Sequence, residues 1–115
     1  MGRGTYTTEG VTAIADALRV NGSLTNIDVG HNGIGKEAAL NLVSIFKEKD
    51  RMTSVGLAAC ALGADGAKAV ADYILVSGSL TNLSLEYNGI DSEGAKAIAD
   101  ALRVNGSLTE LNLSS

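Results

Sequence analysis

Residues 80–90 read Leu-Thr-Asn-Leu-Ser-Leu-Glu-Tyr-Asn-Gly-Ile, and this stretch decides the fold of the chain. Its pattern is L-x-x-L-x-L-x-x-N-x-I. The pattern begins again at Leu24 and, with looser residue choices, at Met52, and its first six positions recur from Leu108. The starting points at 24, 52, 80 and 108 are 28 residues apart each time. A fixed period of this length predicts a solenoid, in which each repeat is one structural unit stacked on the next.

Each repeat changes its hydrophobic spacing halfway along. Apolar and polar residues alternate from Leu83 to Glu86, which is typical of a strand with one buried face. Further on, Ala95, Ile98 and Leu102 fall at spacings of three and four, which is typical of a helix. Because a helix follows each strand, the next strand returns parallel to it, and the Asn-Gly pairs in the chain are not hairpin turns. We expect helices over residues 7–21, 35–49, 63–77 and 91–104, the last with Asp91 as its N-cap and Gly106 as its stop signal.

Residues at the same place in successive repeats form columns, and the apolar columns define the expected core. No member of an apolar column is charged, and shifting the alignment by one residue would place charges inside. The strand halves give the columns Leu24, Met52, Leu80 and Leu108; Ile27, Val55, Leu83 and Leu111; Val29, Leu57, Leu85 and Leu113; and, at the turn, Tyr6, Ile34, Leu62 and Ile90. The helix halves give Ile14, Leu42, Val70 and Ile98, and Leu18, Phe46, Ile74 and Leu102.

The pattern resembles that of leucine-rich repeat proteins, and the 28-residue period resembles their ribonuclease-inhibitor-like subfamily. The resemblance implies an α/β fold, a leucine-rich repeat solenoid. It would be a right-handed βα superhelix with a curved parallel sheet on the concave side and helices on the convex side. The resemblance also implies that Asn32 and Asn88 hydrogen-bond the backbone of neighbouring turns. Cys60 takes the same position in the middle repeat, and we expect it to be buried and structural.

The repeats define one domain. Residues 1–3 precede the repeat pattern and are expected to be an N-terminal remnant. The single leucine-rich repeat domain, 4–115, then divides into a helix half-repeat 4–22, repeats 23–50, 51–78 and 79–106, and a strand half-repeat 107–115. Residues 13–25 are identical to residues 97–109, which indicates either recent duplication or consensus design.

The repeat pattern begins in a helix half and stops after a strand half, with no polar capping segment, which a terminal repeat usually needs. One interpretation is a fragment of a longer array. The other is self-association through the open ends of the solenoid, where the last strand presents Leu108, Leu111 and Leu113 as an edge. The two interpretations are compatible with each other.

Charge and composition narrow the expected partners and compartment. The formal net charge of −4 argues against nonspecific binding to nucleic acid or to an anionic membrane. The single cysteine rules out an internal disulfide and fits a reducing compartment. No apolar run approaches the roughly 20 residues of a membrane span, and the N-terminus has no secretion signal. We expect a cytoplasmic protein with no nucleic-acid or membrane partner.

The sequence offers no catalytic constellation. His31 is the only histidine, so a two-histidine zinc site is impossible. Residues 33–37 resemble a phosphate-binding loop only superficially, because they lack its spacing and its Ser or Thr. Asp28 and His31 lie close in sequence, but nothing positions a serine such as Ser84 as a nucleophile beside them. We therefore expect no enzyme activity and no catalytic, cofactor-binding or metal-binding residues.

The informative surface is the concave side of the sheet, called the sheet face below. It holds three acidic residues and no Lys or Arg. Tyr87 is its best single anchor, because Tyr is favoured at the centres of protein interfaces. The small residues Gly56, Ala58 and Ala59 weaken the case, and a solvated sheet without a partner is the alternative. The expected protein-binding residues are Asn26, Asp28, His31, Asn82, Ser84, Glu86, Tyr87, Glu110 and Asn112.

These observations favour a non-catalytic scaffold that binds an unidentified protein partner through the sheet face and associates with itself through its ends. One alternative is a fragment of a GTPase-activating array, by resemblance to leucine-rich repeat activators of the small GTPase Ran, although those are longer and usually carry an acidic tail. The other alternative is a designed or excised self-assembling repeat module, which the identical segments 13–25 and 97–109 favour.

Overall fold

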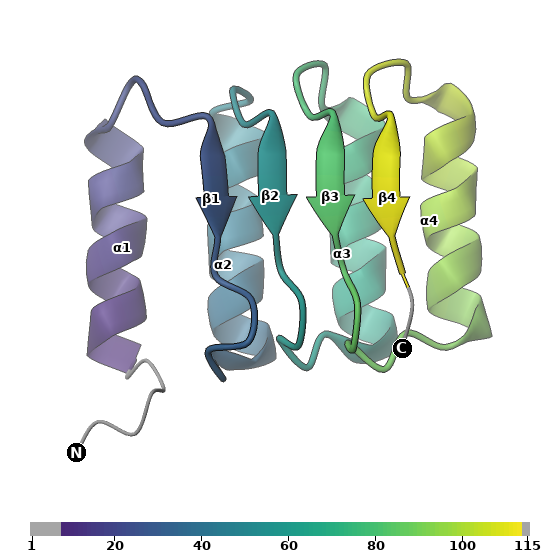
Figure 1. The fold of residues 1–115 in the computed structure, drawn as a ribbon, viewed down its shortest axis with the longest axis horizontal. Helices are drawn as coiled ribbons and strands as arrows, with labels where there is room; N and C mark the ends of the chain where they lie inside the picture. Colours follow the sequence, from purple (N-terminus) through teal and green to yellow (C-terminus); the bar gives the residue numbers. More distant parts are fainter. Residues whose placement is uncertain (1–7, 114–115) are drawn as a thin grey trace.

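The computed structural model describes residues 8–113, and over this range helices and strands alternate four times. The helices form one layer and the strands a second layer in front of it (Figure 1). The helices are α1 (Thr8–Val20), α2 (Gly35–Glu48), α3 (Gly63–Val76) and α4 (Ser92–Val104). The strands are β1 (Asn26–Asp28), β2 (Ser54–Gly56), β3 (Asn82–Ser84) and β4 (Glu110–Asn112). The predicted α/β repeat solenoid is therefore confirmed.

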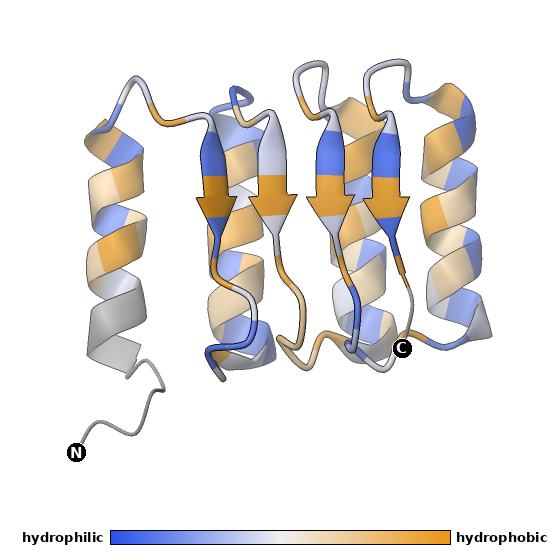
Figure 2. Ribbon diagram, in the orientation of Figure 1, coloured by the Kyte–Doolittle hydropathy of each residue, from blue (hydrophilic) through white to orange (hydrophobic). Residues whose placement is uncertain are grey.

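The four strands form one parallel sheet in the order β1-β2-β3-β4. Ile27 pairs with Val55, Val55 with Leu83, and Leu83 with Leu111, so each residue faces the one 28 positions along. The predicted columns are therefore the register of the sheet. Figure 2 shows the consequence for each strand, an apolar middle residue with more polar neighbours on both sides.

The helix ends agree with the sequence pattern to within one residue over the described range. The carboxylate of Asp91 accepts a 2.9 Å hydrogen bond from the Gly94 N–H, which confirms its prediction as the N-cap of α4. Gly106 follows the C-cap residue Asn105, as predicted, but without the positive φ of a glycine cap. Asn105 leaves the helical conformation first, and its side-chain oxygen accepts the N–H groups of Ser107 and Leu108. None of the helices within residues 8–113 has the length and apolar content that crossing a membrane would require.

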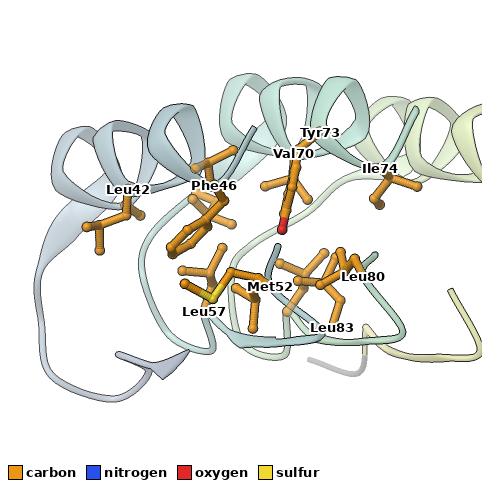
Figure 3. Packing of buried hydrophobic residues seen from close by; sticks show 14 of the residues in the cluster. Leu42, Phe46, Met52, Leu57, Val70, Tyr73, Ile74, Leu80 and Leu83 are labelled. Carbon is orange, nitrogen blue, oxygen red and sulfur yellow. The ribbon is translucent and has the colours of Figure 1, made fainter. Parts of the chain in front are cut away.

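The core lies between the helix layer and the sheet, and it is deepest in the middle repeats (Figure 3). Leu42, Val70 and Ile98 are fully buried there, as their columns predict. Column members in the outer repeats are less covered, because a neighbouring layer is present on only one side. Leu24 is 37% exposed, whereas Leu80 in the same column is completely buried. The predicted core residue Tyr6 lies outside the described residues.

Tyr73 is a large core residue that the columns did not include. It extends from α3 into the core, is fully buried and has its ring 6.0 Å from that of Phe46 on α2 (Figure 3). Ala17, Ile45 and Ala101 occupy the equivalent position in the other repeats. Burial, together with the negative charge of Asp50, raises the pKa of the Tyr73 hydroxyl well above its usual value. The tyrosine therefore stays neutral and fills the space between α2 and α3.

Candidate functional site

The structure brings the predicted binding residues together on the sheet face. Asn26 and Asp28 come from β1, Asn82 and Ser84 from β3, and Glu110 and Asn112 from β4. Glu86 and Tyr87 follow β3, and His31 follows β1 at the equivalent turn. The side chains of Asp28 and Glu110 are exposed, while Glu86 is half-buried. This arrangement gives the sheet face an acidic character with no positive charge among its predicted residues.

His31 and Tyr87 meet across an intervening repeat. Their rings lie 6.0 Å apart, centre to centre, with an angle of 58° between the ring planes. Residue 59 lies between them in the register, and its side chain is only a methyl group. The small size of Ala59, which seemed a weakness of the site in the sequence, is what allows the two rings to approach. Tyr87 remains 60% exposed and available to a partner.

The backbone at this rim is left-handed in three successive repeats. The φ angles are +62° at His31, +55° at Ala59 and +59° at Tyr87. An L-residue in this region costs roughly 1–2 kcal/mol, so neighbouring structure must hold it there. The N–H of His31 donates to the Ala58 carbonyl, and that of Ala59 donates to the Glu86 carbonyl, each over 2.9 Å. The orientation of the rim side chains is therefore fixed by the stacking of the repeats.

A hollow of about 190 Å³ lies in the middle of the sheet face. It forms because Ser54 and Gly56 of β2 are small, while Asn26 and Asp28 stand beside them on β1. A Cβ atom on Gly56 would lie only 2.5 Å from Oδ1 of Asp28, so glycine is needed for this carboxylate to occupy its place. The hollow therefore combines a carboxylate wall with the hydroxyl-bearing residues Ser54 and Ser84.

Glu86 and Glu110 differ in how their carboxylates are satisfied. One oxygen of Glu110 accepts a 3.0 Å hydrogen bond from the side-chain amide of Asn82. By contrast, Oε1 of Glu86 is buried, and no group among the described residues donates a hydrogen bond to it. A buried acceptor without a donor is unfavourable by about 1–3 kcal/mol. Glu86 is thus the acidic residue of the sheet face whose carboxylate is least satisfied by the described residues.

The turns after the strands are held by Asn88, as the resemblance implied. Its side-chain oxygen accepts the N–H groups of Cys60 and Leu62, and its amide donates to the carbonyls of Leu57 and Leu85. Among the described residues, the side-chain amide of Asn32 donates a 3.1 Å hydrogen bond to the Gly30 carbonyl. Asn88 thus ties the third turn to the turn of the preceding repeat.

Cys60 is buried, in agreement with its prediction. Burial, with a smaller effect of the Asp28 charge, raises the pKa of its thiol to about 11. Its Sγ is 3.6 Å from the Ala58 carbonyl. A thiol with this pKa is almost entirely protonated at neutral pH and is a poor nucleophile.

The expected self-association edge is less open than its sequence indicates. Leu108, Leu111 and Leu113 are half-buried and pack against the core.

Across the described part of the chain, no cluster of three or more His, Cys, Asp or Glu side chains is placed to hold a metal ion. The chemistry that the described site offers is hydrogen bonding, negative charge and aromatic contact.

Comparison with known proteins agrees with this architecture. A sequence profile described as "Leucine Rich repeat" matches residues 20–43 and 77–99. With the four stacked βα units, this match defines the class: the chain is a leucine-rich repeat protein. No curated protein matches the sequence. The ribonuclease-inhibitor-like subfamily remains a prediction.

Two solved structures share the fold at low sequence identity. One is of leiomodin-1 actin-binding site 2, with a TM-score of 0.83 and 18% identity, covering 99% of this chain and 67% of that one. The other is the C-terminal domain of tropomodulin from Caenorhabditis elegans, with a TM-score of 0.63 and 17% identity, covering 91% of this chain and 83% of that one. At these identities the likeness concerns the fold alone.

Proposed function

We propose that the chain is a non-catalytic protein-interaction scaffold that receives a protein partner on its sheet face. The observation that carries the proposal is the contact between His31 and Tyr87 beside the unsatisfied carboxylate of Glu86. Aromatic side chains on a rigid backbone are the residues that most often dominate binding energy at protein interfaces. Here they stand next to an acceptor that lacks a donor.

The chemistry of the sheet face favours a partner with basic and polar side chains. An arginine or lysine of the partner can donate to Glu86 and contact the face of the Tyr87 ring, which combines a charge-assisted hydrogen bond with a cation–π interaction. A second basic or amide side chain fits the hollow beside Asp28. Acidic partners are disfavoured, because Asp28, Glu86 and Glu110 would repel them.

Actin is the first partner to assay, because the structurally similar leiomodin-1 domain is named for an actin-binding site. If actin does not bind, the partner is sought by affinity capture with the wild-type chain. The affinity for the partner is then measured by calorimetry for the wild type, for the double variant Glu86→Lys/Glu110→Lys and for Tyr87→Ala. We expect both variants to weaken binding at least about tenfold.

The matched control is Glu48→Lys, which reverses an exposed acidic residue on α2, away from the sheet face. It should bind the partner as the wild type does. An unchanged affinity of the Glu86→Lys/Glu110→Lys variant would contradict the proposal. Stimulation of GTP hydrolysis in a panel of small GTPases would favour a GTPase-activating array instead.

Self-association through the ends of the solenoid is a second candidate function. It is favoured by the identity of residues 13–25 and 97–109, which place the same helix surface in α1 and in α4.

A further inference from the structure

The surface by which α4 packs on α3 is present a second time on α1. In α4 this surface contains Gly94 and Ala101. A Cβ atom on Gly94 would lie 2.8 Å from the Cβ of Ala67, so the two helices approach closely at this glycine. Gly10 and Ala17 occupy the same positions in α1. Ala101 is only 4% exposed, whereas Ala17 is exposed.

The opposite side of α4 is the side on which a following helix would pack. In α1 and α3 the side that faces the following helix carries Ala15 and Ala71, which are 1% and 6% exposed. The equivalent residue of α4 is Ala99, and it is exposed. The outer side of α1 and the outer side of α4 thus carry the residues that form the helix–helix contacts inside the solenoid.

The loops that follow α1 and α4 also have the same sequence, and their polar side chains can bind a preceding repeat. Residues 105–109, Asn-Gly-Ser-Leu-Thr, bind the preceding repeat through side-chain donors. The Asn105 amide donates to the carbonyls of Ile74 (2.7 Å) and Ser77 (3.0 Å), and Oγ of Ser107 donates to the carbonyl of Leu80 (2.8 Å). Residues 21–25 have the identical sequence.

In the first repeat these donors are not engaged in the same way. Like that of Asn105, the side-chain oxygen of Asn21 accepts the N–H groups of the residues two and three positions on, here Ser23 and Leu24. Within residues 8–113, no carbonyl accepts from the Asn21 amide group as those of α3 do from Asn105. The carbonyls that accept from Asn105 and Ser107 belong to Ile74, Ser77 and Leu80. The carbonyls 28 residues further along, beside α4, are those of Leu102, Asn105 and Leu108.

We propose that a second copy of the chain docks on the outer side of α4 through its own α1 and residues 21–25. The contact repeats the packing of α4 on α3, with Ala17 of one copy against Ala99 of the other. Asn21 donates to the carbonyls of Leu102 and Asn105, and Ser23 to that of Leu108. The surface on each copy is different, so the association is head-to-tail and continues into a ring or a filament. This inference rests on the second candidate function above and not on the sheet face.

The test uses the 115-residue chain, with light scattering after size exclusion from micromolar to millimolar concentration. The wild-type mass should rise from 11.7 kDa to at least about twice that value. Ala17→Arg blocks only the α1 surface, and Ala99→Arg blocks only the α4 surface, so each variant alone should stay monomeric. An equimolar mixture should form a dimer and nothing larger, because only one pair of surfaces remains intact.

Ser44→Arg is the control, since Ser44 is an exposed residue of α2 and belongs to neither of the two proposed surfaces. It should associate as the wild type does. Circular dichroism checks that each variant keeps its helices, and Ala13→Arg, on the same exposed side of α1, replaces Ala17→Arg if that variant is unfolded. A wild-type chain that stays monomeric throughout overturns the inference, and so does a mixture that forms no dimer.

Partner binding on the sheet face and self-association through α1 and α4 can be contradicted independently of each other. Ala17→Arg and Ala99→Arg leave the sheet face unchanged, so partner binding should survive in both. Tyr87→Ala lies in the third repeat, away from α1, α4 and residues 105–110, so self-association should survive in it.

Discussion

The side-chain oxygen of Asn88 accepts a 2.7 Å hydrogen bond from the backbone N–H of Cys60, 28 residues earlier in the chain. The same oxygen also accepts from Leu62, and the amide group donates to the Leu57 carbonyl. One buried side chain thus satisfies the backbone of a turn in the preceding repeat. Because Leu57, Cys60 and Leu62 are buried, their backbone N–H and C=O groups depend on this residue.

Replacement of Asn88 by Ala is expected to lower the free energy of unfolding by at least about 3 kcal/mol, because it leaves several buried backbone groups without partners. Asn82→Ala is the control. Among the described residues the Asn82 side chain donates one exposed hydrogen bond, to Glu110, and its loss should cost about 1 kcal/mol. Urea unfolding followed by circular dichroism measures both values. Equal losses in the two variants would contradict the role of Asn88 in satisfying the buried turn before it.

Replacement of Ala61 by Gly should stabilise the protein. Ala61 has φ +56°, and glycines occupy the equivalent positions 33 and 89 with φ angles of +65° and +63°. The relief of backbone strain outweighs the greater freedom of glycine in the unfolded chain, for a net gain of about 0.5–1 kcal/mol. Ala99→Gly in the middle of α4 should show the opposite sign, a loss of about 1 kcal/mol. Thermal unfolding of the two variants compares them directly.

Asp50 should stabilise the fold at neutral pH and lose this effect in acid. Burial alone would raise the pKa of Asp50, but hydrogen bonds from the Ser77 hydroxyl, the Gly78 N–H and the Ser79 hydroxyl lower it overall. The folded protein therefore holds the charged form more strongly than the unfolded chain does. The resulting stability is present above the ordinary value of 3.8 and disappears as the pH falls through the lower pKa of the folded state.

The corresponding measurement is urea unfolding of the wild type and Asp50→Ala at neutral pH and at about pH 2. The difference between the two proteins should shrink in acid. Asp72→Ala, which removes an exposed aspartate of α3, serves as the control. A difference for Asp50→Ala that is the same at both pH values would show that its carboxylate charge does not matter.

Asn105 and Asn21 are the same residue in the same five-residue sequence, yet their removal should have unequal effects. Asn105 donates two hydrogen bonds to α3 and its C-terminal end, and Asn21 has no such repeat before it among the described residues. Asn105→Ala should therefore cost about 2 kcal/mol more than Asn21→Ala. Chemical unfolding at low micromolar protein concentration, where self-association is minimal, tests this. Equal costs would mean that the bonds to the preceding repeat contribute nothing to stability.

The Cys60 thiol should react slowly in the folded protein. Since its pKa is raised from 9.0 to about 11, the thiolate fraction at mildly alkaline pH falls about 100-fold relative to the unfolded chain. The rate of reaction with a chromogenic disulfide, with and without denaturant, measures this ratio. A folded-state rate close to the unfolded one would refute the assignment of Cys60 as a structural residue.

Much of the fold follows from the sequence because one spacing is repeated. The pairing of Ile27, Val55, Leu83 and Leu111 was predictable, since a constant 28-residue period fixes the register of every strand. Tyr73 was not predictable in this way. Its column holds alanine or isoleucine in the other repeats, so the pattern gave no indication that a large ring fills the space beside Phe46.

The candidate site was predictable as a list of residues on one face but not as a geometry. The contact between His31 and Tyr87 depends on left-handed backbone at non-glycine residues, for which the sequence carries no signal. The hollow beside Asp28 depends on two small residues of β2, Ser54 and Gly56, and the sequence pattern alone indicated only that Gly56 weakens the surface. Both features arise between repeats, where side chains of different size meet.

The left-handed rim has a consequence for the thermodynamics of recognition. The unfavourable φ angles of His31, Ala59 and Tyr87 are imposed when the repeats stack, so this conformational free energy belongs to folding. A partner arriving at the sheet face meets backbone that is already ordered, and it needs to restrict only side-chain rotation. Preorganisation of this kind reduces the entropy lost on association, and it lets two aromatic rings contribute to affinity on a surface that is otherwise made of short polar residues.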